Sequence, residues 1–205
     1  MILITGCARS GTSLTTQILQ LHGLHLGPVN VLFENTDIRE SVLKPYLRAI
    51  GTDPRGQKPL PDTDSLPAHV GLRDAVLKRV PETSGYKDAK LTLVWPVWAK
   101  AFPQAKWVLV RRKAEDIAGS CLRASFMNAF DTMDGWLGWV AEHEKRFEKM
   151  KAALDIIEVW PRDYIEDAGK FQPVADHCGL AFNGDAVKAA IHPGLFLSAT
   201  KSPAR

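Results

Sequence analysis

The start of the chain constrains the fold more than any other stretch, because an apolar run, a loop bounded by glycines and a helical pattern follow one another directly. Residues 1–5 read MILIT, residues 6–13 read GCARSGTS, and LTTQILQL continues from there. A glycine-rich turn between a strand and a helix lets backbone N–H groups and the positive end of the helix dipole converge on an anion. The opening therefore predicts a strand, an anion-binding loop and a helix.

Short apolar runs alternate with helical patterns along the rest of the chain, which is typical of a parallel sheet covered by helices on both faces. The predicted strands are residues 2–5, 29–33, 85–88, 106–110 and 155–160. The predicted helices are residues 14–21, 37–50, 95–102, 114–126 and 132–154. At 205 residues and 45% hydrophobic side chains, the chain has the size of one domain. We expect a single α/β domain of the P-loop type over residues 1–205.

One region, residues 51–80, departs from this alternation. Its first part, residues 51–71, holds four prolines and three glycines between two helical patterns. Excursions of this length in compact domains are functional lids or mobile insertions, and composition does not separate the two. We expect an irregular surface segment that helps to form a substrate pocket, after which residues 72–80 return the chain to the domain as a helix.

Charge and cysteine content limit the partners of the protein. The net charge of +3 fits an anionic ligand but does not indicate nucleic acid. The three cysteines have no metal-ligand spacing, and their odd number argues against a disulfide framework. No basic leader precedes the first strand, and no apolar run approaches the roughly eighteen residues of a membrane span. We expect a cytoplasmic protein without a metal site and without nucleic-acid or membrane partners, whose oligomeric state has no readable signature.

The opening loop has the outline of the phosphate-binding motif G-x-x-x-x-G-K-[ST] but lacks its lysine. Gly6 and Gly11 keep the glycine spacing and Ser13 keeps the hydroxyl, whereas Thr12 stands where the lysine belongs. Arg9, at the crown of the loop, offers a forked cation suited to an oxyanion. Loss of the lysine argues against an ATP or GTP hydrolase, which uses it on the β and γ phosphates together with Mg²⁺.

A second junction between a strand and a helix carries further basic residues. Arg111 and Arg112 follow the predicted strand 106–110, a helix begins near Ala114, and Ser120 lies two turns into that helix. An arginine folded over the helix N-terminus and a serine hydroxyl can share one oxyanion. An arginine pair before a helix usually lies at the solvent-exposed surface and binds no ligand. This pair indicates an anion site only when it is considered together with the opening loop.

Together the two segments resemble the sulfotransferases that use 3′-phosphoadenosine 5′-phosphosulfate (PAPS). That family has [KR]-S-G-T-[ST] after its first strand, matched here by Arg9, Ser10, Gly11, Thr12 and Ser13. It also has R-x-x-x-D-x-x-x-S after a later strand, matched by Arg112, Asp116 and Ser120. The stretch of residues 85–110 is similar to bacterial members, and the resemblance extends over about residues 1–180.

The resemblance implies transfer of a sulfuryl group from PAPS to a hydroxyl or amine, with 3′-phosphoadenosine 5′-phosphate as the product. Residues 9–13 would cradle the 5′-phosphosulfate, and Arg112 and Ser120 would hold the 3′-phosphate. Trp160 is the candidate for the aromatic that contacts adenine, although VWPRDY departs from the family's YED pattern there. The C-terminal basic element of the family is missing, and Lys201 and Arg205 are the possible substitutes.

Sulfuryl transfer requires in-line approach of the acceptor, stabilisation of negative charge and removal of the acceptor's proton, and it needs no metal in principle. Lys87 ends its predicted strand beside the ligand crevice of the sheet, where an ammonium can contact the sulfonate, as a lysine does at this point in the family. The alternative for Lys87 is an ordinary surface lysine.

Three residues are candidates for removing the acceptor's proton, namely Glu34, Asp88 and His143. Cytosolic members of the family use a histidine two residues after the lysine, where this chain has Ala89. Other branches place a glutamate after the second strand, and Glu34 occupies that position. We favour Glu34 as the base, because partial burial makes a carboxylate a better proton acceptor. The alternatives are that Glu34 caps the next helix, or that Asp88 or His143 is the base, although His143 lies on an apolar helix face typical of a core residue.

Two other functions remain open at this point. A P-loop kinase of small molecules would need a loop lysine and a carboxylate for Mg²⁺, and the lysine is absent. A nucleotide-binding scaffold without turnover would bind the nucleotide and transfer nothing. The acceptor, whether a small molecule or the hydroxyl of a carbohydrate or peptide, has no signature in the sequence.

Overall fold

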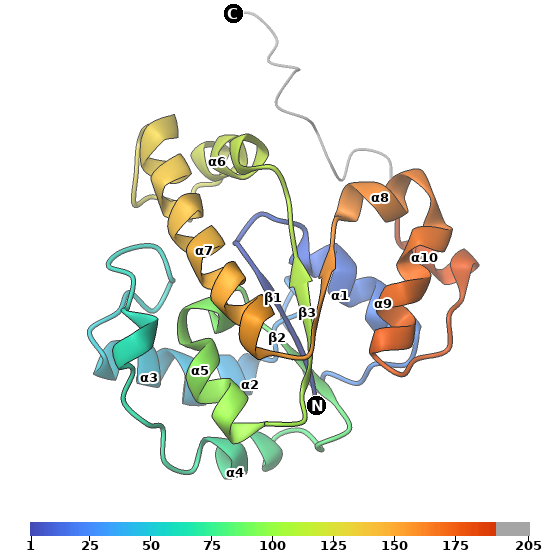
Figure 1. Ribbon diagram of the computed structural model, residues 1–205, viewed down its shortest axis with the longest axis horizontal. Coiled ribbons are helices and arrows are strands. Elements are labelled where there is room, and N and C mark those ends of the chain that lie inside the picture. The colour runs from blue at the N-terminus through green and yellow to red at the C-terminus, as the bar shows by residue number, and fades with distance from the viewer. Residues whose placement is uncertain (192–205) are drawn as a thin grey trace, which may run out of the picture.

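Four parallel strands form one sheet in the computed structural model, which describes residues 1–191 (Figure 1). The strands are β1 (Ile2–Gly6), β2 (Gly85–Lys87), β3 (Lys106–Val110) and β4 (Ile156–Val159), in the order β2-β1-β3-β4. In the register of the sheet, Leu3 of β1 lies opposite Tyr86 of β2 and Trp107 of β3. The predicted α/β class is confirmed, and so are four of the five predicted strands.

Helices cover both faces of this sheet (Figure 1). One face packs against α1 (Thr12–Leu21), α8 (Pro161–Glu166), α9 (Gln172–His177) and α10 (Gly184–Ala190), with the short turn η3 (Ala168–Phe171) between them. The other face packs against α4 (Leu72–Leu77), α5 (Leu91–Ala101), α6 (Ala114–Arg123) and α7 (Met133–Ala153). A continuous helical segment formed by α2 (Thr36–Ile38), the π-turn η1 (Arg39–Leu43) and α3 (Lys44–Ala49) adds to that second layer.

Alternation along the strands explains why both faces are apolar. Leu3 and Leu109 point into the layer of α5 and α7, while Ile4 and Val108 point into the layer of α1 and α10. All four side chains are fully buried. Parallel strands that are buried on both faces read as continuous apolar runs, which is why they are visible in the sequence.

Most helix predictions agree with the structure to within a few residues, and the largest difference has a local cause. The helix α5 begins at Leu91, four residues before the prediction, and it is kinked at Val94, whose φ and ψ are −133° and 21°. Pro96 lies two residues further on. Because a proline disfavours helical geometry in the residues before it, the first turn of α5 is separated from the rest by a kink.

Residues 29–33 do not form a strand, so that prediction is wrong. The side chain of Asn30 accepts hydrogen bonds from the N–H groups of Leu32 at 2.8 Å and Glu34 at 3.1 Å, which closes a turn. Val31, at the tip of this turn, is 91% exposed. An asparagine that satisfies nearby backbone donors offers the chain an alternative to pairing in a sheet. An apolar run can therefore form a turn.

The excursion of residues 51–71 is irregular apart from the short turn η2 (Thr63–Ser65). Its buried Gln57 fastens it to the loop after α6, since Nε2 donates to Phe126 O at 2.7 Å and Oε1 accepts from Asn128 N at 2.9 Å. The excursion is thus a packed part of the domain.

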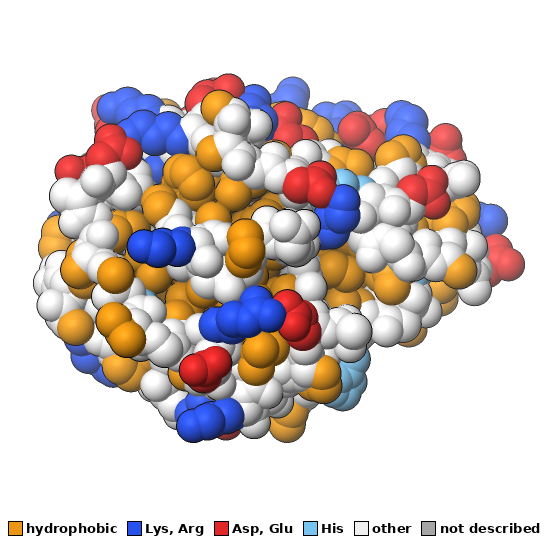
Figure 2. Space-filling model, turned by 60° about the horizontal axis from the view of Figure 1, so that its bottom comes forward, with side chains coloured by type: hydrophobic (Ala, Val, Ile, Leu, Met, Phe, Trp, Pro, Cys, Tyr) orange, Lys and Arg blue, Asp and Glu red, His pale blue; other side chains and the backbone are white. Residues whose placement is uncertain are grey.

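No helix within residues 1–191 is both long and apolar enough to cross a membrane. The cysteines Cys7, Cys121 and Cys178 are free thiols. Figure 2 shows the surface with the lower side of Figure 1 brought forward, where apolar side chains occupy the middle among a few charged ones.

Candidate active site

The carboxyl ends of the four parallel strands lie at one edge of the sheet, and the predicted site residues follow them there. β1 leads into the loop 7–11, β2 ends at Lys87, β3 leads into Arg111 and Arg112, and β4 leads into Trp160. In open α/β sheets, ligands bind in the crevice outside this edge.

The opening loop is shaped by two glycines. A Cβ at Gly6 would lie 2.3 Å from the carbonyl oxygen of Val110, and Gly11, immediately before α1, has a φ of 105°. No side chain of residues 1–191 caps the N-terminus of α1, and its first turn holds no acidic residue. The N–H groups of this first turn are therefore placed to bind an anion.

Arg9 joins this loop to α6. Its Nε donates to Ser120 Oγ at 3.0 Å, and Nη1 of Arg112 donates to the carbonyl oxygen of Arg9 at 3.0 Å. Arg9 adopts a left-handed φ of 73°, which costs a non-glycine residue about 1–3 kcal/mol. The two predicted anion sites are thus in direct contact, and the side chain of Arg9 lies with Arg112 and Ser120.

A second cluster forms where the turn of residues 29–35 meets β2 and α1. Lys87 Nζ donates to Leu32 O at 2.9 Å and to Ser13 Oγ at 3.4 Å, and it lies 3.5 Å from Glu34 Oε1. The side chains of Lys87 and Glu34 are only 3% and 6% exposed. Burial lowers the pKa of Lys87, and the negative charges of Glu34 and Asp88 oppose that shift. The cluster places a buried ammonium, a hydroxyl and a carboxylate side by side.

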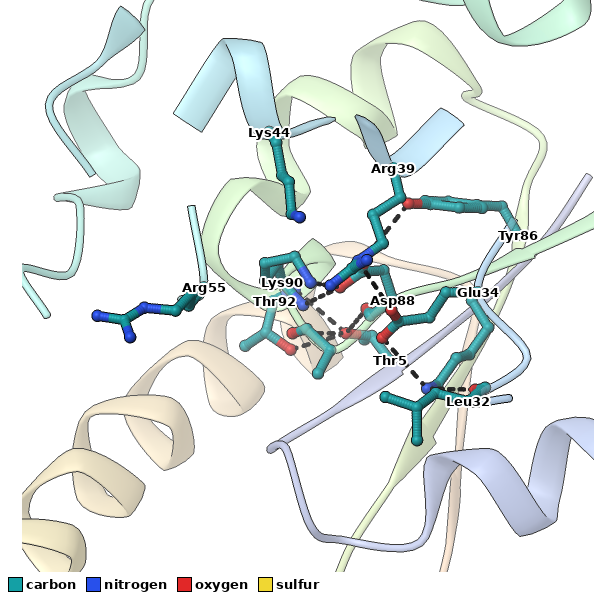
Figure 3. A network of polar contacts seen from close by, with 12 residues as sticks. Thr5, Leu32, Glu34, Arg39, Lys44, Arg55, Tyr86, Asp88, Lys90 and Thr92 are labelled. Carbon is teal, nitrogen blue, oxygen red and sulfur yellow. Dashed lines mark hydrogen bonds and ion pairs between the residues drawn. The ribbon is translucent and has the colours of Figure 1, made fainter. Parts of the chain in front are cut away.

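Glu34 is held from two further directions. Its Oε2 lies 3.0 Å from Arg39 Nε, and the two side chains point toward one another in Figure 3. Asn30 Nδ2 donates to the same oxygen at 3.3 Å. The N-terminus of α2 is capped by Asn35, whose side chain accepts from Ile38 N at 3.0 Å. Glu34 therefore does not serve as that cap.

Asp88 has a structural environment. It is fully buried, its Oδ1 lies 2.7 Å from Lys90 Nζ and accepts from Lys90 N at 2.9 Å, and its Oδ2 accepts from Tyr86 OH at 3.3 Å (Figure 3). Burial alone would raise the pKa of Asp88, but the charge and hydrogen bonds of Lys90 outweigh burial and leave it below its usual value. A carboxylate held in this way is a weak proton acceptor.

His143 lies in the core, as its helix face predicts. It is buried beside Trp139, whose ring centroid is 4.0 Å away, and its Nδ1 lies 2.9 Å from Trp139 O. Burial lowers the pKa of His143 to about 4. Among the described residues, no hydrogen bond links the side chain of His143 to the residues at the carboxyl edge of the sheet.

Trp160 shares a cavity of about 620 Å³ with Arg112 and Asp116. The ring is 38% exposed, and the Arg111 guanidinium lies 5.4 Å from its centroid. An exposed indole beside an arginine is a suitable surface for a planar base. Lys201 and Arg205, the possible basic substitutes, lie outside the described residues.

Ser10 completes the loop in an unusual way. Its side chain is fully buried, and Oγ has no hydrogen-bond partner among the described residues. Buried hydroxyls are normally paired, so an unpaired one inside an anion-binding loop is what a phosphate oxygen would satisfy. The residues present therefore fit a nucleotide with phosphate groups at both ends.

Two contributors to the site are not apparent from sequence patterns. Arg39 looks like an ordinary helix-surface residue, and the role of Asn30 depends on a turn where we predicted a strand. The only signal was indirect, namely an asparagine four residues before Glu34. Within residues 1–191, no cluster of three or more His, Cys, Asp or Glu side chains is placed to bind a metal ion.

Comparisons with known proteins agree with this geometry. Residues 1–172 match the family model described as the sulfotransferase domain. A sulfotransferase from Mycobacterium tuberculosis has a similar structure, with a TM-score of 0.53 and 17% identity over 92% of this chain and 69% of that one.

Retinol dehydratase, solved with the inactive cofactor PAP and androsterone and, separately, with PAP and retinol, has a TM-score of 0.50 at 17% identity. The match covers 92% of this chain but only 62% of retinol dehydratase. At this identity the solved structures show a shared fold. No curated protein sequence matches the chain.

Proposed function

Because this chain belongs to the sulfotransferase domain family, we propose that it transfers a sulfuryl group from PAPS to a hydroxyl, or to an amine, and releases 3′-phosphoadenosine 5′-phosphate. The observation that carries the proposal is the contact between the two anion sites, in which Arg9 reaches Ser120 while Arg112 donates to Arg9 O. A nucleotide with phosphate groups at its 5′ and 3′ ends would occupy both anion sites. ATP carries phosphates only at its 5′ end and would leave the second site empty.

Each end of the nucleotide has its own set of donors in this proposal. The backbone of residues 9–13 and the unpaired Ser10 hydroxyl bind the 5′ end, while Arg112 and Ser120 bind the 3′-phosphate. Trp160 contacts the adenine from the wall of the adjoining cavity. When bound, PAPS supplies a sulfuryl group attached to a phosphate leaving group.

Lys87 and Ser13 stabilise the negative charge that develops during transfer. The ammonium lies 3.4 Å from Ser13 Oγ at the start of α1, where the helix dipole is positive. Donors that are already oriented in a buried site lower the barrier because little reorganisation is needed as the charge develops.

Glu34 accepts the acceptor's proton. In the resting site, Lys87 lies 3.5 Å from Glu34 Oε1 and Arg39 lies 3.0 Å from Oε2. An anion bound at the start of α1 shares the charge of Lys87 and places a negative charge near Glu34, so the carboxylate becomes a better proton acceptor without a movement of Lys87. Arg39 and Asn30 keep the carboxylate in place through Oε2.

We place the acceptor pocket beside residues 51–80. In this proposal the whole chain, residues 1–205, forms one domain. Gly56 packs so closely on Lys90 that a Cβ there would lie 2.8 Å from Lys90 Cγ, and Lys90 is three residues from Lys87. A small-molecule acceptor is supported by the similarity to retinol dehydratase, which was solved with androsterone and with retinol.

Calorimetry with 3′-phosphoadenosine 5′-phosphate and with ADP, both in the presence of EDTA, tests the nucleotide specificity. We expect the bisphosphate to bind at least about tenfold more tightly, because a charged hydrogen bond to the 3′-phosphate is worth about 1.5–3 kcal/mol. Arg112→Ala should remove this preference and leave ADP binding unchanged. Preference for ADP, or a strict Mg²⁺ requirement, would contradict the proposal.

A second measurement concerns transfer itself. Radiolabelled PAPS incubated with a panel of phenols and aliphatic alcohols should give labelled sulfate esters. Binding of the bisphosphate without any transfer would instead support a nucleotide-binding scaffold. The kinase alternative is not favoured, because Thr12 replaces the loop lysine and the family match covers residues 1–172.

A further inference from the structure

Asn30 makes an unusual number of contacts within five residues of chain. Its Oδ1 accepts from Leu32 N at 2.8 Å and from Glu34 N at 3.1 Å, and its Nδ2 donates to Glu34 Oε2 at 3.3 Å. Its backbone N–H donates to Glu34 O at 3.0 Å, and its carbonyl oxygen accepts from Phe33 N at 2.9 Å. Both polar ends of the side chain and both backbone groups are therefore used.

These contacts fix a turn that the local sequence does not favour by itself. Phe33 has a left-handed φ of 61°, which is uncommon for a residue with a bulky side chain. Val29 and Phe33 pack against the core at the two ends of the turn, whereas Val31 at its tip is exposed, so packing does not hold the tip. The hydrogen bonds of Asn30 offset the strain.

The turn presents two acceptors to the same ammonium group. Leu32 O lies 2.9 Å from Lys87 Nζ and also accepts from Ser13 Oγ at 3.1 Å, while Glu34 Oε1 lies 3.5 Å from Lys87 Nζ. Leu32 and Glu34 are the two residues whose N–H groups bind Asn30 Oδ1. One side chain thus determines where both acceptors lie.

We propose that Asn30 is a positioning residue of the active site, whose side chain holds the Leu32 carbonyl and the Glu34 carboxylate around the Lys87 ammonium. The role rests on the proposed function, in which Lys87 stabilises charge and Glu34 accepts a proton. Asn30 itself touches no reacting atom, and it acts through the turn of residues 30–34.

Two substitutions separate the parts of this role. Asn30→Ala removes all side-chain hydrogen bonds. Asn30→Asp keeps an oxygen for the N–H groups of Leu32 and Glu34, but it removes the donor to Glu34 and places a second carboxylate beside it. Asn183→Ala is the matched control, because Asn183 Oδ1 also accepts two backbone N–H groups, those of Asp185 at 3.0 Å and Ala186 at 3.2 Å, at the start of α10.

The first readout needs no enzymatic activity. In the full chain with isotope-labelled lysine, the Lys87 side-chain resonance is assigned by its loss in Lys87→Arg and then titrated with pH. Asn30→Ala should lower the pKa of Lys87 by about 0.5 or more, because its acceptors are no longer held in place. Asn30→Asp should raise it by a similar amount, since it adds a negative charge. The charged groups Glu34, Asp88 and Lys90 near Lys87 are the same in both variants.

The second readout is the kinetics of transfer from PAPS to the best phenol or alcohol of the panel. We expect kcat to fall about tenfold or more in both Asn30 variants, while KM for PAPS stays within about twofold of wild type. Asn183→Ala should change neither the Lys87 titration nor kcat.

An unchanged Lys87 titration in both Asn30 variants would overturn the proposal, as would the same changes in Asn183→Ala. A loss of PAPS binding that matches the loss of kcat would also overturn it, because that pattern indicates general disruption. If wild type transfers no sulfuryl group, the proposed function fails, and the Lys87 titration still decides whether Asn30 positions the two acceptors.

Discussion

Glu34 and Glu40 both pair with Arg39, but only Glu34 lies in the buried site. Glu34 Oε2 is 3.0 Å from Arg39 Nε, and Glu40 Oε1 is 2.8 Å from Arg39 Nη1 on the exposed side. Glu40 also pairs with Lys44 at 2.7 Å, so it serves as a control that has the same charge and also contacts Arg39 but lies outside the buried site.

We predict that Glu34→Gln lowers sulfuryl transfer by about a hundredfold or more, because the amide cannot accept the acceptor's proton. Glu40→Gln should leave transfer within about twofold. Both variants should bind 3′-phosphoadenosine 5′-phosphate normally by calorimetry. Transfer at the wild-type rate in Glu34→Gln would leave Glu34 with a structural role only.

Gly6 has no room for a side chain. Its φ is 154°, and an added Cβ would meet Val110 O at 2.3 Å and Ser10 Oγ at 2.9 Å. Gly138 in α7 is the opposite case, since a Cβ there would meet nothing within 4 Å.

Gly6→Ala should therefore lower the free energy of unfolding by about 1–3 kcal/mol, because β1 and β3 must move apart. Gly138→Ala should raise it by about 0.5–1 kcal/mol, because alanine is the better helix former. Urea denaturation of the two variants and wild type measures both. A stable Gly6→Ala protein with intact nucleotide binding would show that the loop tolerates a shift.

At the scale of elements, one buried side chain links the segment of residues 51–71 to the loop after α6. Gln57 donates to Phe126 O and accepts from the N–H groups of Asn128 and Ala129, at distances of 2.7, 2.9 and 3.0 Å. The centroid of the Phe126 ring lies 5.8 Å from the Arg9 guanidinium, so this set of contacts extends to the loop of residues 6–13.

Gln57→Ala should remove the hydrogen bonds to the partly buried N–H groups of Asn128 and Ala129, at a cost of about 1–3 kcal/mol. Hydrogen exchange should then become faster in residues 51–71 and 124–131 and stay unchanged in β1 and β3. Gln104→Ala, at an exposed position, serves as the control. Equal protection in Gln57→Ala and wild type would mean that the other contacts of the segment, such as those from Trp139 Nε1 to Gly56 O and from Arg146 Nη2 to Pro61 O, are sufficient to hold it.

The sequence predicted elements well where one physical cause dominated. Three strands, β1, β2 and β3, are largely buried and read as apolar runs, and β4 is partly buried at the edge of the sheet. The loop of residues 6–13 is marked by glycines whose geometry disfavours any other residue. The turn of residues 29–33 was mistaken for a strand because apolar residues there are exposed and Asn30 takes the backbone donors. Hydropathy does not record which hydrogen bonds a side chain will make.

The site was predicted in the same uneven way. Arg9, Arg112 and Ser120 carry a motif spacing, and the structure brings them into contact. The contacts of Arg39 and Asn30 with Glu34 depend on how the turn folds back on β2. Such three-dimensional neighbours have no fixed spacing, so the sequence alone did not reveal them.

For the whole molecule, the buried His143 makes stability depend on pH. Its pKa is about 4 in the folded protein and near 6.5 when exposed, so the unfolded chain binds a proton between these values while the folded protein does not. The contribution of His143 is complete above about pH 6.5 and declines as the pH falls toward 4.

Wild type should therefore lose about 2–3 kcal/mol more of its free energy of unfolding between pH 7 and pH 4.5 than His143→Gln does. Urea denaturation at the two pH values measures the difference. Equal losses in the two proteins would show that other groups cause the acid sensitivity.

The register of the sheet has a further consequence for the whole molecule. Gly6 of β1 lies directly opposite Val110 of β3, so the loop that follows each strand starts from the same rung of the ladder. Backbone pairing in the core therefore sets the separation between the two loops that we propose to bind the phosphate groups. Inserting one residue into either strand would offset its loop by about 3.3 Å and turn the neighbouring side chains to the opposite face, so the two proposed sites would no longer match one nucleotide.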